Sequence, residues 1–338
     1  MSYAILIGYG SIGKRHLEEL LKTFDNIHVL DAKFTCETQM DVQAGAHIQL
    51  FSDFSQIPRG HVYELAVIAT WGPTHFEVAE QLIPFSPRFI LLEKPVESSL
   101  QKVDALENLL NDNNIPAAVN FPHRYGTLMK EIKNILHSNV VGKICSVTLT
   151  GGAKCIATNG IHYLDFFMEL FCEIPKNVFS NLTNDPINPR SQTLSYLGGM
   201  ASFEFSSGRM LVLNFSNNSF ADLSLEVIFE RGRLLYRNSI LKAWRVQESS
   251  IYENRPINRS LDFDKLFLDL DLNTSSQTDG ISNLYSLIRD NPRDFSITDF
   301  TESSRQLIKA LIAQTKVINL DSLTMYNENE YKKDWHIS

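Results

Sequence analysis

The sequence predicts an α/β fold in which an N-terminal Rossmann domain with a parallel sheet precedes a C-terminal α+β domain with a large, mostly antiparallel sheet. Three observations carry this prediction. Short apolar runs alternate with amphipathic segments over the first third of the 338 residues, a glycine-rich turn follows the first of these runs, and strand-like segments follow one another closely in the second half. We expect the division near Phe121, with one domain at 1–121 and the other at 122–338.

The first domain is expected to begin with a strand at residues 4–7, because a continuous apolar run is typical of a strand buried on both faces. The helix that follows carries on one face Ile12, His16, Leu17, Leu20 and Leu21. Further strands are expected at 27–30, 65–69, 89–92 and 117–119, with helices at about 73–82 and 103–111. Strands that alternate with helices indicate a parallel sheet.

The second domain has a different order of elements. Helices are expected at about 127–137 and 161–171, with a strand at 144–151 between them. Strand-like stretches then follow at 177–182, 199–205, 209–215, 223–229, 233–237 and 242–247. The pair Ser207 and Gly208 predicts a hairpin turn, the polar stretch 273–280 predicts a loop, and a last helix is expected at about 302–317.

Composition and charge narrow the classes of protein and partner. Hydrophobic residues make up 43% of the chain, and the formal net charge of −8 argues against nucleic acid or an anionic membrane as the main partner. The four cysteines form no CxxC pair and match no zinc or disulfide pattern, so reduced thiols are expected. With no signal peptide and no apolar run long enough to span a membrane, we expect a cytoplasmic protein.

A dinucleotide fingerprint of the form G-x-G-x-x-G lies between the first strand and the first helix and reads Gly8-Tyr9-Gly10-Ser11-Ile12-Gly13. In this pattern Gly8 permits the tight turn, Gly10 lets the backbone approach the pyrophosphate, and Gly13 allows the helix to pack closely on the strand. The pyrophosphate then lies on the free N–H groups where Ser11 and Ile12 begin the helix. A glycine-rich turn in a non-binding domain is the alternative.

The acidic residue that ends the second strand indicates which dinucleotide binds. Asp31 lies about 20 residues after the fingerprint, where a carboxylate accepts hydrogen bonds from the hydroxyls of the adenosine ribose. The same charge repels the additional phosphate of NADP, so NAD is the expected cofactor. Lys33, close by, weakens this preference and leaves NADP possible.

Several further motifs resemble the Gfo/Idh/MocA family of oxidoreductases. The resemblance rests on Lys14-Arg15-His16, Ala69-Thr70-Trp71-Gly72-Pro73-Thr74-His75, Glu93-Lys94-Pro95, the segment from Asn120 to Tyr125, and Gly160-Ile161-His162-Tyr163-Leu164-Asp165. It implies hydride transfer between a nicotinamide cofactor and a hydroxyl or carbonyl carbon of a sugar or related polyol. It also implies that the open sheet of the second domain forms the interface of a homodimer or homotetramer.

Lys94 is the first candidate catalytic residue. It lies just beyond the carboxyl end of a predicted strand, where open α/β sheets bind ligands, and an ammonium group there can stabilise alkoxide charge or relay a proton. A solvated lysine at a loop end is the alternative, and the resemblance favours function. The resemblance also implies that Glu93 shapes the nicotinamide site and that the Lys94–Pro95 bond is cis.

His162 is the second candidate catalytic residue, because an imidazole can act as an acid–base group on the reacting hydroxyl. Asp165 follows three residues later on the same helical face, where it could contact the substrate, orient the histidine or only pack. Members of the family often carry an aspartate four residues before this histidine, whereas Thr158 stands there in this sequence. Asn159 and Tyr163 are therefore candidates for binding substrate hydroxyls. No third ligand has a sensible spacing, so no metal site is expected.

The resemblance places further residues near the ligands. Thr70 and His75 are expected in the cofactor pocket with Glu93 and Lys94, although His75 could equally cap a helix or pack. Arg124 is a candidate contact for a carboxylate or phosphate on the substrate, with an ordinary surface charge as the alternative.

These motifs together indicate an NAD(P)-dependent dehydrogenase or reductase that acts on a sugar, a sugar derivative or a nucleotide sugar. One alternative is a hydrolase or epimerase that oxidises its substrate transiently and retains NAD, so that the cofactor co-purifies. Another is a non-catalytic NAD-binding regulator, which only Thr158 supports.

Overall fold

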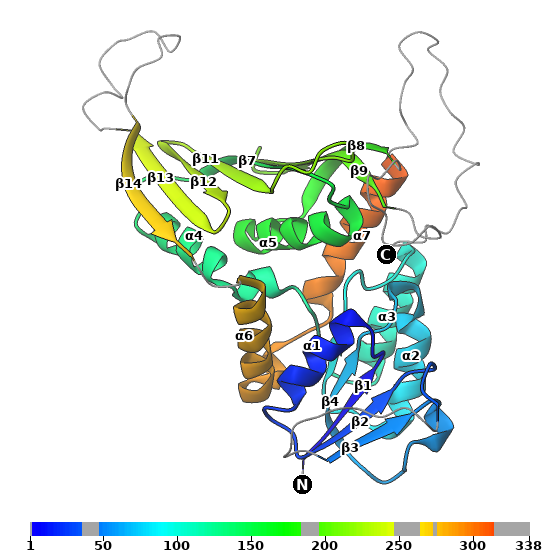
Figure 1. Cartoon of the computed structure of the whole chain (residues 1–338). Helices are drawn as coiled ribbons and strands as arrows, with labels where there is room; N and C mark the ends of the chain where they lie inside the picture. The colour runs from blue at the N-terminus through cyan, green and yellow to red at the C-terminus, as the bar shows by residue number, and fades with distance from the viewer. Residues whose placement is uncertain (1, 36–46, 184–195, 247–263, 273–275, 314–338) are drawn as a thin grey trace, which may run out of the picture. The chain divides into compact units, whose positions relative to one another are not determined.

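The computed structural model describes residues 2–35, 47–183, 196–246, 264–272 and 276–313 (Figure 1). These residues separate into two compact units. Among the described residues, one unit comprises those up to Asn120 together with Ser282–Ile308, and the other comprises those from Phe121 to Ile281 together with 309–313. The return of Ser282–Ile308 to the first unit is a feature that the sequence did not predict.

The first unit is built on six strands, all parallel, in the order β3-β2-β1-β4-β5-β6. Their bounds are β1 (Tyr3–Ile7), β2 (Asn26–Leu30), β3 (His47–Phe51), β4 (Tyr63–Ile68), β5 (Ile90–Leu92) and β6 (Ala117–Val119). Leu6 and Val67 are fully buried in the central strands, as the apolar runs predicted. The strand order reverses between β1 and β4, which is the switch point where doubly wound sheets bind nucleotides.

The helices of this unit come from both ends of the chain. The N-terminal part supplies α1 (Ser11–Leu20), α2 (His75–Leu82) and α3 (Leu100–Asp112), and the returning segment supplies most of α6 (Ser276–Asp290) and α7 (Thr298–Ala313). Ser282 of α6 donates a hydrogen bond to Glu19 of α1 at 3.0 Å. The returning segment is therefore bonded directly to the helix that follows the glycine fingerprint.

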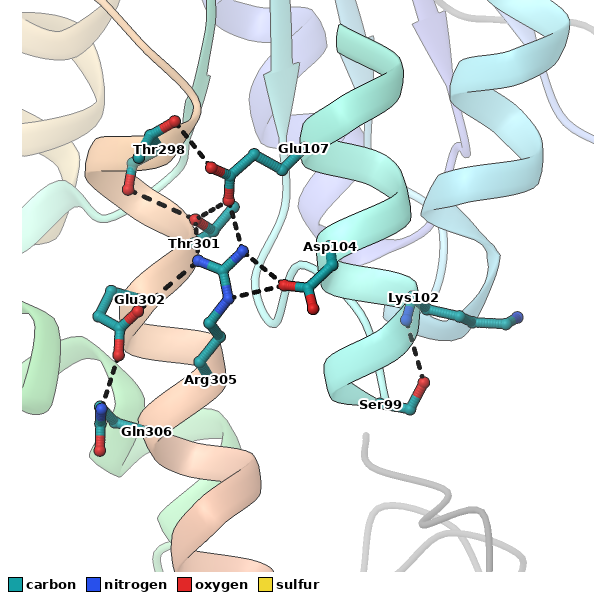
Figure 2. Close-up of polar contacts among 9 residues, drawn as sticks. All are labelled: Ser99, Lys102, Asp104, Glu107, Thr298, Thr301, Glu302, Arg305 and Gln306. Atoms are coloured by element: carbon teal, nitrogen blue, oxygen red, sulfur yellow. Dashed lines mark hydrogen bonds and ion pairs between the residues drawn. The ribbon is translucent and has the colours of Figure 1, made fainter. Parts of the chain in front are cut away.

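A partly buried ion-pair cluster joins α7 to α3 (Figure 2). Arg305 donates to Asp104 at 2.8 Å and also to Glu107, while the hydroxyls of Thr298 and Thr301 each donate to Glu107 at 2.8 Å. Burial alone would raise the pKa of Glu107, but the hydrogen bonds from Arg305 and the two threonines hold that pKa below its usual value. The carboxylate of Glu107 therefore stays charged and accepts hydrogen bonds from three side chains of α7.

The second unit contains an eight-stranded sheet in the order β14-β13-β12-β11-β7-β10-β9-β8. Neighbouring strands are antiparallel except β10 and β7, which are parallel. The bounds are β7 (Ile144–Gly152), β8 (Pro175–Thr183), β9 (Gly198–Phe205), β10 (Met210–Ser216), β11 (Ser224–Phe229), β12 (Gly232–Arg237), β13 (Ile240–Val246) and β14 (Asp264–Asp271). The predicted fold class, a parallel sheet followed by a mostly antiparallel one, is confirmed.

One face of this sheet packs on α5 (Ile161–Phe171) (Figure 1). The other helix of this region, α4 (Thr127–His137), precedes β7 in the chain. Both helices have the bounds that their periodicity predicts. The rings of Phe171 on α5 and Phe205 on β9 meet edge to face with centroids 4.9 Å apart. The expected hairpin turn is present, with Gly208 at a φ of 83°.

Two expectations about the C-terminal elements were wrong in detail. The stretch 273–280 is not all loop, because α6 begins at Ser276. A Cβ at Gly280 would collide with the carbonyl oxygen of Pro122, so this glycine serves close packing of the helix and marks no turn. The last helix begins at Thr298, one turn before the expected 302, because Phe300 is buried at 3% exposure. Residues 314–317 lie outside the described residues.

Within the described ranges, no helix is both long enough and apolar enough to cross a membrane. Across the same ranges, no group of three or more His, Cys, Asp or Glu side chains is arranged to hold a metal ion. Cys145, Cys155 and Cys172 are free thiols, and Cys36 lies outside the described residues.

His28 on β2 makes the stability of the first unit depend on pH. It is 3% exposed and lies 2.6 Å from the hydroxyl oxygen of Tyr63, and burial, with help from His61 and His47, lowers its pKa from 6.5 to about 4. The pKa of His28 is lower in the folded state than in the unfolded state. The stability that its neutral ring contributes is therefore complete above pH 6.5 and is lost as the pH falls towards 4. Between pH 7 and pH 5, urea denaturation should show the wild type losing about 2 kcal/mol more than His28→Gln. Equal losses in the two proteins would contradict this account.

Candidate functional site

The predicted cofactor residues of the first unit gather at one edge of its sheet. Because β1, β4, β5 and β6 are parallel, their carboxyl ends meet there. Gly8 follows β1, Thr70 follows β4, Lys94 follows β5 and Asn120 follows β6. The edge next to the switch point therefore carries both the glycine fingerprint and the candidate lysine.

The fingerprint turn is built so that two of its glycines cannot be replaced. Gly8 has a φ of 94°, and a Cβ there would lie 2.7 Å from the backbone carbon of Ala69. A Cβ at Gly13 would collide with the carbonyl oxygen of Gly8. At Gly10 the same construction meets nothing within 4 Å, so the space beside this residue is open. The turn is closed on the protein side and open on the side where a ligand would approach.

The N-terminus of α1 offers free backbone donors to an anion. Gly10 is its N-cap and supplies no side-chain acceptor, and the first turn, which includes Ser11 and Ile12, holds no acidic residue. Asp31 accepts hydrogen bonds from the N–H groups of Tyr9 at 2.7 Å and Lys33 at 2.9 Å. Asp31 thus fixes the fingerprint turn. The sequence predicted a contact of Asp31 with the ribose but did not predict this second role.

These observations test whether a dinucleotide fits the site. The turn forms a cradle that a Cβ at Gly8 or Gly13 would fill, and the uncapped helix start matches the charge of a pyrophosphate. At the same edge Asn120 is 2% exposed, and no donor in the described part of the chain reaches its Oδ1 atom. A buried acceptor without a donor is what a site completed by a ligand leaves behind. The residues present fit the group.

The segment Glu93–Glu97, which we name the Lys94 loop, is held at several points. Val96 donates its N–H to the hydroxyl of Ser304 on α7 at 3.0 Å, and Glu97 accepts the N–H of Phe76 at 2.8 Å. The Lys94–Pro95 bond is cis, as the resemblance implied. Glu93, Pro95, Val96 and Glu97 are buried, whereas Lys94 is partly exposed. Hydrogen bonds to α7 and α2 therefore hold the loop, and Lys94 is its one partly exposed residue.

His75 joins this loop to the end of β4. Its Nδ1 atom lies 3.0 Å from the carbonyl oxygen of Val96, and its Nε2 atom lies 3.2 Å from that of Thr70. The ring is fully buried, and burial lowers the pKa of His75. The geometry matches the packing alternative, so His75 would influence a cofactor through the two loops that it connects.

Three residues at this edge were not among the predicted site residues. His16 and Asn120 both bond to the carboxylate of Glu93, at 2.9 Å and 2.6 Å, and Tyr285 bonds to His16 at 2.8 Å. His16 and Asn120 stood within motifs that carried the resemblance, which was a usable signal. No sequence pattern pointed to Tyr285, which is 269 residues from His16.

In the second unit, two predicted substrate contacts bind each other. Arg124 donates to both oxygens of Asp165 at 2.6 Å, and Asp165 is fully buried. Burial by itself would lower the pKa of Arg124, but the charge and hydrogen bonds of Asp165 raise it. The two opposite charges form a bidentate pair that links the segment after β6 to α5. A substrate contact by either residue stays a prediction.

His162 on α5 lies in a cluster of aromatic rings. The centroid of His123 lies 5.2 Å from that of His162 and 5.0 Å from that of Tyr163, and Phe121 meets His162 edge to face at 5.9 Å. Burial raises the pKa of Tyr163, so its hydroxyl stays protonated. His123 was missed as a candidate, although it stands beside the predicted Arg124.

Thr158 lies in a π-helical turn, Ile156–Gly160, directly before α5. It is 3% exposed, and Asn159 accepts the N–H of Cys155 at 3.2 Å within the same turn. Short π-helical turns are frequent at functional sites. The turn sets the start of the helix that carries His162, with a neutral hydroxyl where the family often has a carboxylate.

The glycines of the fingerprint give a paired prediction. Gly13→Ala should lower the melting temperature and abolish NADH binding, because its methyl group displaces the Gly8 carbonyl. Gly10→Ala should fold like the wild type, because no protein atom is near, yet bind NADH about tenfold more weakly, because the pyrophosphate needs close approach. Thermal unfolding and calorimetric titration measure the two effects. Full NADH affinity in both variants would show that the ligand does not use this turn.

Comparison with known proteins identifies the first unit. Residues 3–121 match the model of Gfo/Idh/MocA, described as an oxidoreductase family with an NAD-binding Rossmann fold. No curated protein matches the sequence.

Solved structures extend the likeness of fold over both units. UDP-N-acetylglucosamine 3-dehydrogenase GnnA from Acidithiobacillus ferrooxidans is 14% identical with a TM-score of 0.66, over 92% of this chain and 97% of that one. An oxidoreductase from Agrobacterium radiobacter in complex with NAD+, L-tartaric acid and magnesium is 13% identical with a TM-score of 0.69, over 93% and 96%. A super-repressor mutant of Gal80p from Saccharomyces cerevisiae is 12% identical with a TM-score of 0.72, over 93% and 95%. At these identities the likeness shows the fold alone.

Proposed function

We propose, from the premise that residues 3–121 belong to the NAD-binding Rossmann fold of the Gfo/Idh/MocA oxidoreductases, that this protein moves a hydride to or from a sugar-type substrate. The reacting carbon carries a hydroxyl or carbonyl group, and the substrate is a sugar, a sugar derivative or a nucleotide sugar. One observation supports the proposal most strongly. The fingerprint turn and the Lys94 loop share one edge of the parallel sheet, at its switch point.

The cofactor would be held by the first unit. The N–H groups at the start of α1 would bind the pyrophosphate beside Gly10, Asp31 would accept hydrogen bonds from the adenosine ribose, and Thr70 would contribute to the nicotinamide side of the site. When bound, the cofactor accepts or donates a hydride at its nicotinamide ring. The carboxylate of Asp31 favours NAD over NADP.

Lys94 would stabilise the charge of the reacting oxygen. Lys94 directly follows Glu93 in the chain, and its charge helps to lower the pKa of that carboxyl group. In the oxidation direction, Lys94 stabilises the alkoxide that develops on the substrate, and in reduction it holds the proton that the oxygen needs. A held loop suits this role, because only Lys94 on it is partly exposed.

His162 would exchange the proton of the substrate hydroxyl with solvent. The rings of Phe121 and His123 fix its plane, and Tyr163 lies on the next position of α5. With Thr158 in place of a carboxylate, no negative charge from that position supports the imidazole. Asn159 and Tyr163 would bind substrate hydroxyls, and Arg124 with Asp165 would position α5 beside them.

A substrate panel tests the proposal. Sugars, polyols and nucleotide sugars are mixed with NAD(H) or NADP(H) and the full chain, and the nicotinamide absorbance is followed. We expect turnover with at least one compound and turnover slower by about 10³-fold with Lys94→Ala. Bound cofactor that co-purifies, with substrate converted but no net change in absorbance, would replace this proposal with transient oxidation by a hydrolase or epimerase.

A second candidate function is a non-catalytic NAD-binding regulator. Thr158, buried where the family often has an aspartate, favours it. The fold shared with a super-repressor mutant of Gal80p is consistent with it. Tight NAD binding with silence across the whole panel would support the regulator, whereas turnover that depends on Lys94 would exclude it.

We also propose that the large sheet forms the interface of a homodimer or homotetramer. Its face away from α5 carries exposed apolar side chains, including Phe179 at 56%, Ile240 at 42% and Leu266 at 43%. Strand register places these residues on one face, because Phe179 pairs with Ser202 and Ile240 with Arg237, both on the solvent side.

Sedimentation velocity tests this interface. The wild type should sediment as a dimer or tetramer, and Phe179→Glu or Leu266→Glu should shift it towards the monomer, because a charge is costly in an apolar interface. Val62→Glu is a matched control, since Val62 is 48% exposed but lies outside this sheet. A monomeric wild type would contradict the proposed interface.

A further inference from the structure

A buried chain of hydrogen bonds runs from the returning segment to the Lys94 loop. The hydroxyl oxygen of Tyr285 on α6 lies 2.8 Å from Nδ1 of His16 on α1. The Nε2 atom of His16 lies 2.9 Å from Oε1 of Glu93. His16 is fully buried, Glu93 is 6% exposed and Tyr285 is 7% exposed. Three polar side chains from distant parts of the sequence are thus withdrawn from water together.

The chemistry of Glu93 fixes the direction of the bond between His16 and Glu93. Burial alone would raise its pKa, but the hydrogen bond and charge of His16, with Lys94 and Asn120, hold the pKa of Glu93 below its usual value. A carboxylate only accepts, so Nε2 of His16 carries a hydrogen and donates. The Nδ1 atom of His16 shares a second hydrogen bond with the hydroxyl of Tyr285, which burial keeps protonated by raising the pKa of Tyr285.

The two oxygens of Glu93 have different partners. Oε1 accepts from His16 at 2.9 Å and from Asn120 at 2.6 Å. Oε2 lies 3.3 Å from the backbone nitrogen of Lys94, which donates to it. With Oε1 engaged by two donors, the carboxylate plane is set and its negative charge is held next to Lys94.

We propose that His16, held by Tyr285, is a positioning residue that keeps Glu93 ionised, and that Glu93 in turn keeps the ammonium group of Lys94 charged and in place. The inference rests on the proposed function in that Lys94 is taken as the reacting lysine. It assigns a task to the C-terminal segment Ser282–Ile308, whose Tyr285 completes the chain.

The other charged groups nearby are engaged elsewhere. Glu19 influences Tyr285, but its Oε1 atom accepts from Lys22 at 2.7 Å and from Ser282 at 3.0 Å. His75 responds to the charge of Glu93, but its two nitrogens face the carbonyl oxygens of Val96 and Thr70. His16 is therefore the imidazole whose donated hydrogen bond supports Glu93.

A purely structural role would not need this chemistry. An apolar trio of the same volume fills a core as well as a buried hydrogen-bonded chain, and often stabilises it more. The chain is, however, the arrangement that holds a buried carboxylate charged beside a lysine. The test must therefore report on Lys94 and not on stability alone.

The experiment measures how fast Lys94 in the full chain reacts with an acylating reagent at each pH, without cofactor or substrate, by peptide mass spectrometry. Only the neutral amine reacts, so the midpoint pH of labelling reports its charge. In His16→Leu, the carboxylate of Glu93 loses a donor that holds its charge next to Lys94, so the charged amine is less favoured and the midpoint should fall by about one unit. Below the wild-type midpoint, labelling should then be about tenfold faster.

Two further variants separate charge from packing. Tyr285→Phe keeps the ring and removes only the hydroxyl, so it should fold and shift the midpoint in the same direction by less. His16→Gln retains an N–H donor, so its midpoint should lie between that of His16→Leu and that of the wild type. Tyr63→Phe is the matched control, because it removes a hydroxyl from His28 at 2.6 Å in the same unit, away from the Lys94 loop.

The outcomes are distinguishable from those of the proposed function. If His16→Leu or Tyr285→Phe folds and labels Lys94 with the wild-type pH profile, the positioning chain is wrong even where turnover is found. If the midpoint falls in those variants and not in Tyr63→Phe, the chain stands even where the substrate panel is silent. Should His16→Leu fail to fold, Tyr285→Phe alone decides between the two results.

Discussion

Replacing Lys94 by alanine is expected to lower kcat by about 10³-fold on whichever substrate the panel identifies. The ammonium group stabilises charge that develops on the reacting oxygen, so its loss raises the barrier more than it weakens binding. NADH affinity should change by less than about tenfold, because the fingerprint turn and Asp31 hold most of the cofactor. Stopped-flow turnover and calorimetric titration of the same preparation measure both quantities.

Lys102→Ala is the control for this prediction. Lys102 is also a lysine of the first unit, on α3, where it pairs with Glu77 at 2.9 Å. Its removal should leave kcat within about twofold, since exposed ion pairs contribute little. A Lys94→Ala protein with a kcat within threefold of the wild type would remove Lys94 from the mechanism and leave the fold unaffected.

Replacing Arg124 by alanine is expected to lower the free energy of unfolding of the second unit by about 3 kcal/mol. The substitution leaves Asp165, which is fully buried, without the two donors at 2.6 Å that satisfy it. Urea denaturation at neutral pH measures the loss. Arg124→Lys should recover only part of it, because an ammonium group cannot reproduce the bidentate geometry.

The double variant Arg124→Met with Asp165→Leu separates structure from substrate binding. Removing both charges leaves no unpaired buried group, so most of the stability should return. If this double variant folds and still turns over, neither side chain contacts the substrate in a step that matters. If it folds and the KM rises by tenfold or more, the substrate contact predicted for the pair gains support. An unchanged stability of Arg124→Ala would show that the pair is not buried in solution.

The elements that the sequence predicted well are those whose pattern is local. The helix at Thr127–His137 and the strand at Tyr3–Ile7 follow from periodicity and burial alone. β3 (His47–Phe51) was missed because it is an edge strand whose side chains are only partly buried, so no continuous apolar run marks it. The helix α6 was missed because Gly280 and its polar neighbours resemble a turn, and only the contact with Pro122 explains the glycine.

The residues of the candidate site also divide into those marked by a local sequence pattern and those that no pattern marks. Gly8, Gly13 and Lys94 were predicted because short motifs carry their physical purpose. Tyr285 could not be, since its contact with His16 depends on the chain returning to the first unit after 269 residues. The pairing of Arg124 with Asp165 was also missed, because two charges 41 positions apart show no pattern until the segment Pro122–Tyr125 and α5 are placed.

Under the proposed function, Lys94 would contact the nicotinamide end of a bound cofactor. The most direct measurement compares acylation of Lys94 in the wild type with and without saturating NADH, using Lys176 on β8, which is exposed, as an internal reference. We expect NADH to slow labelling of Lys94 by at least about tenfold and to leave Lys176 unchanged. NADH that binds with full occupancy and leaves the labelling rate of Lys94 unaltered would contradict the account.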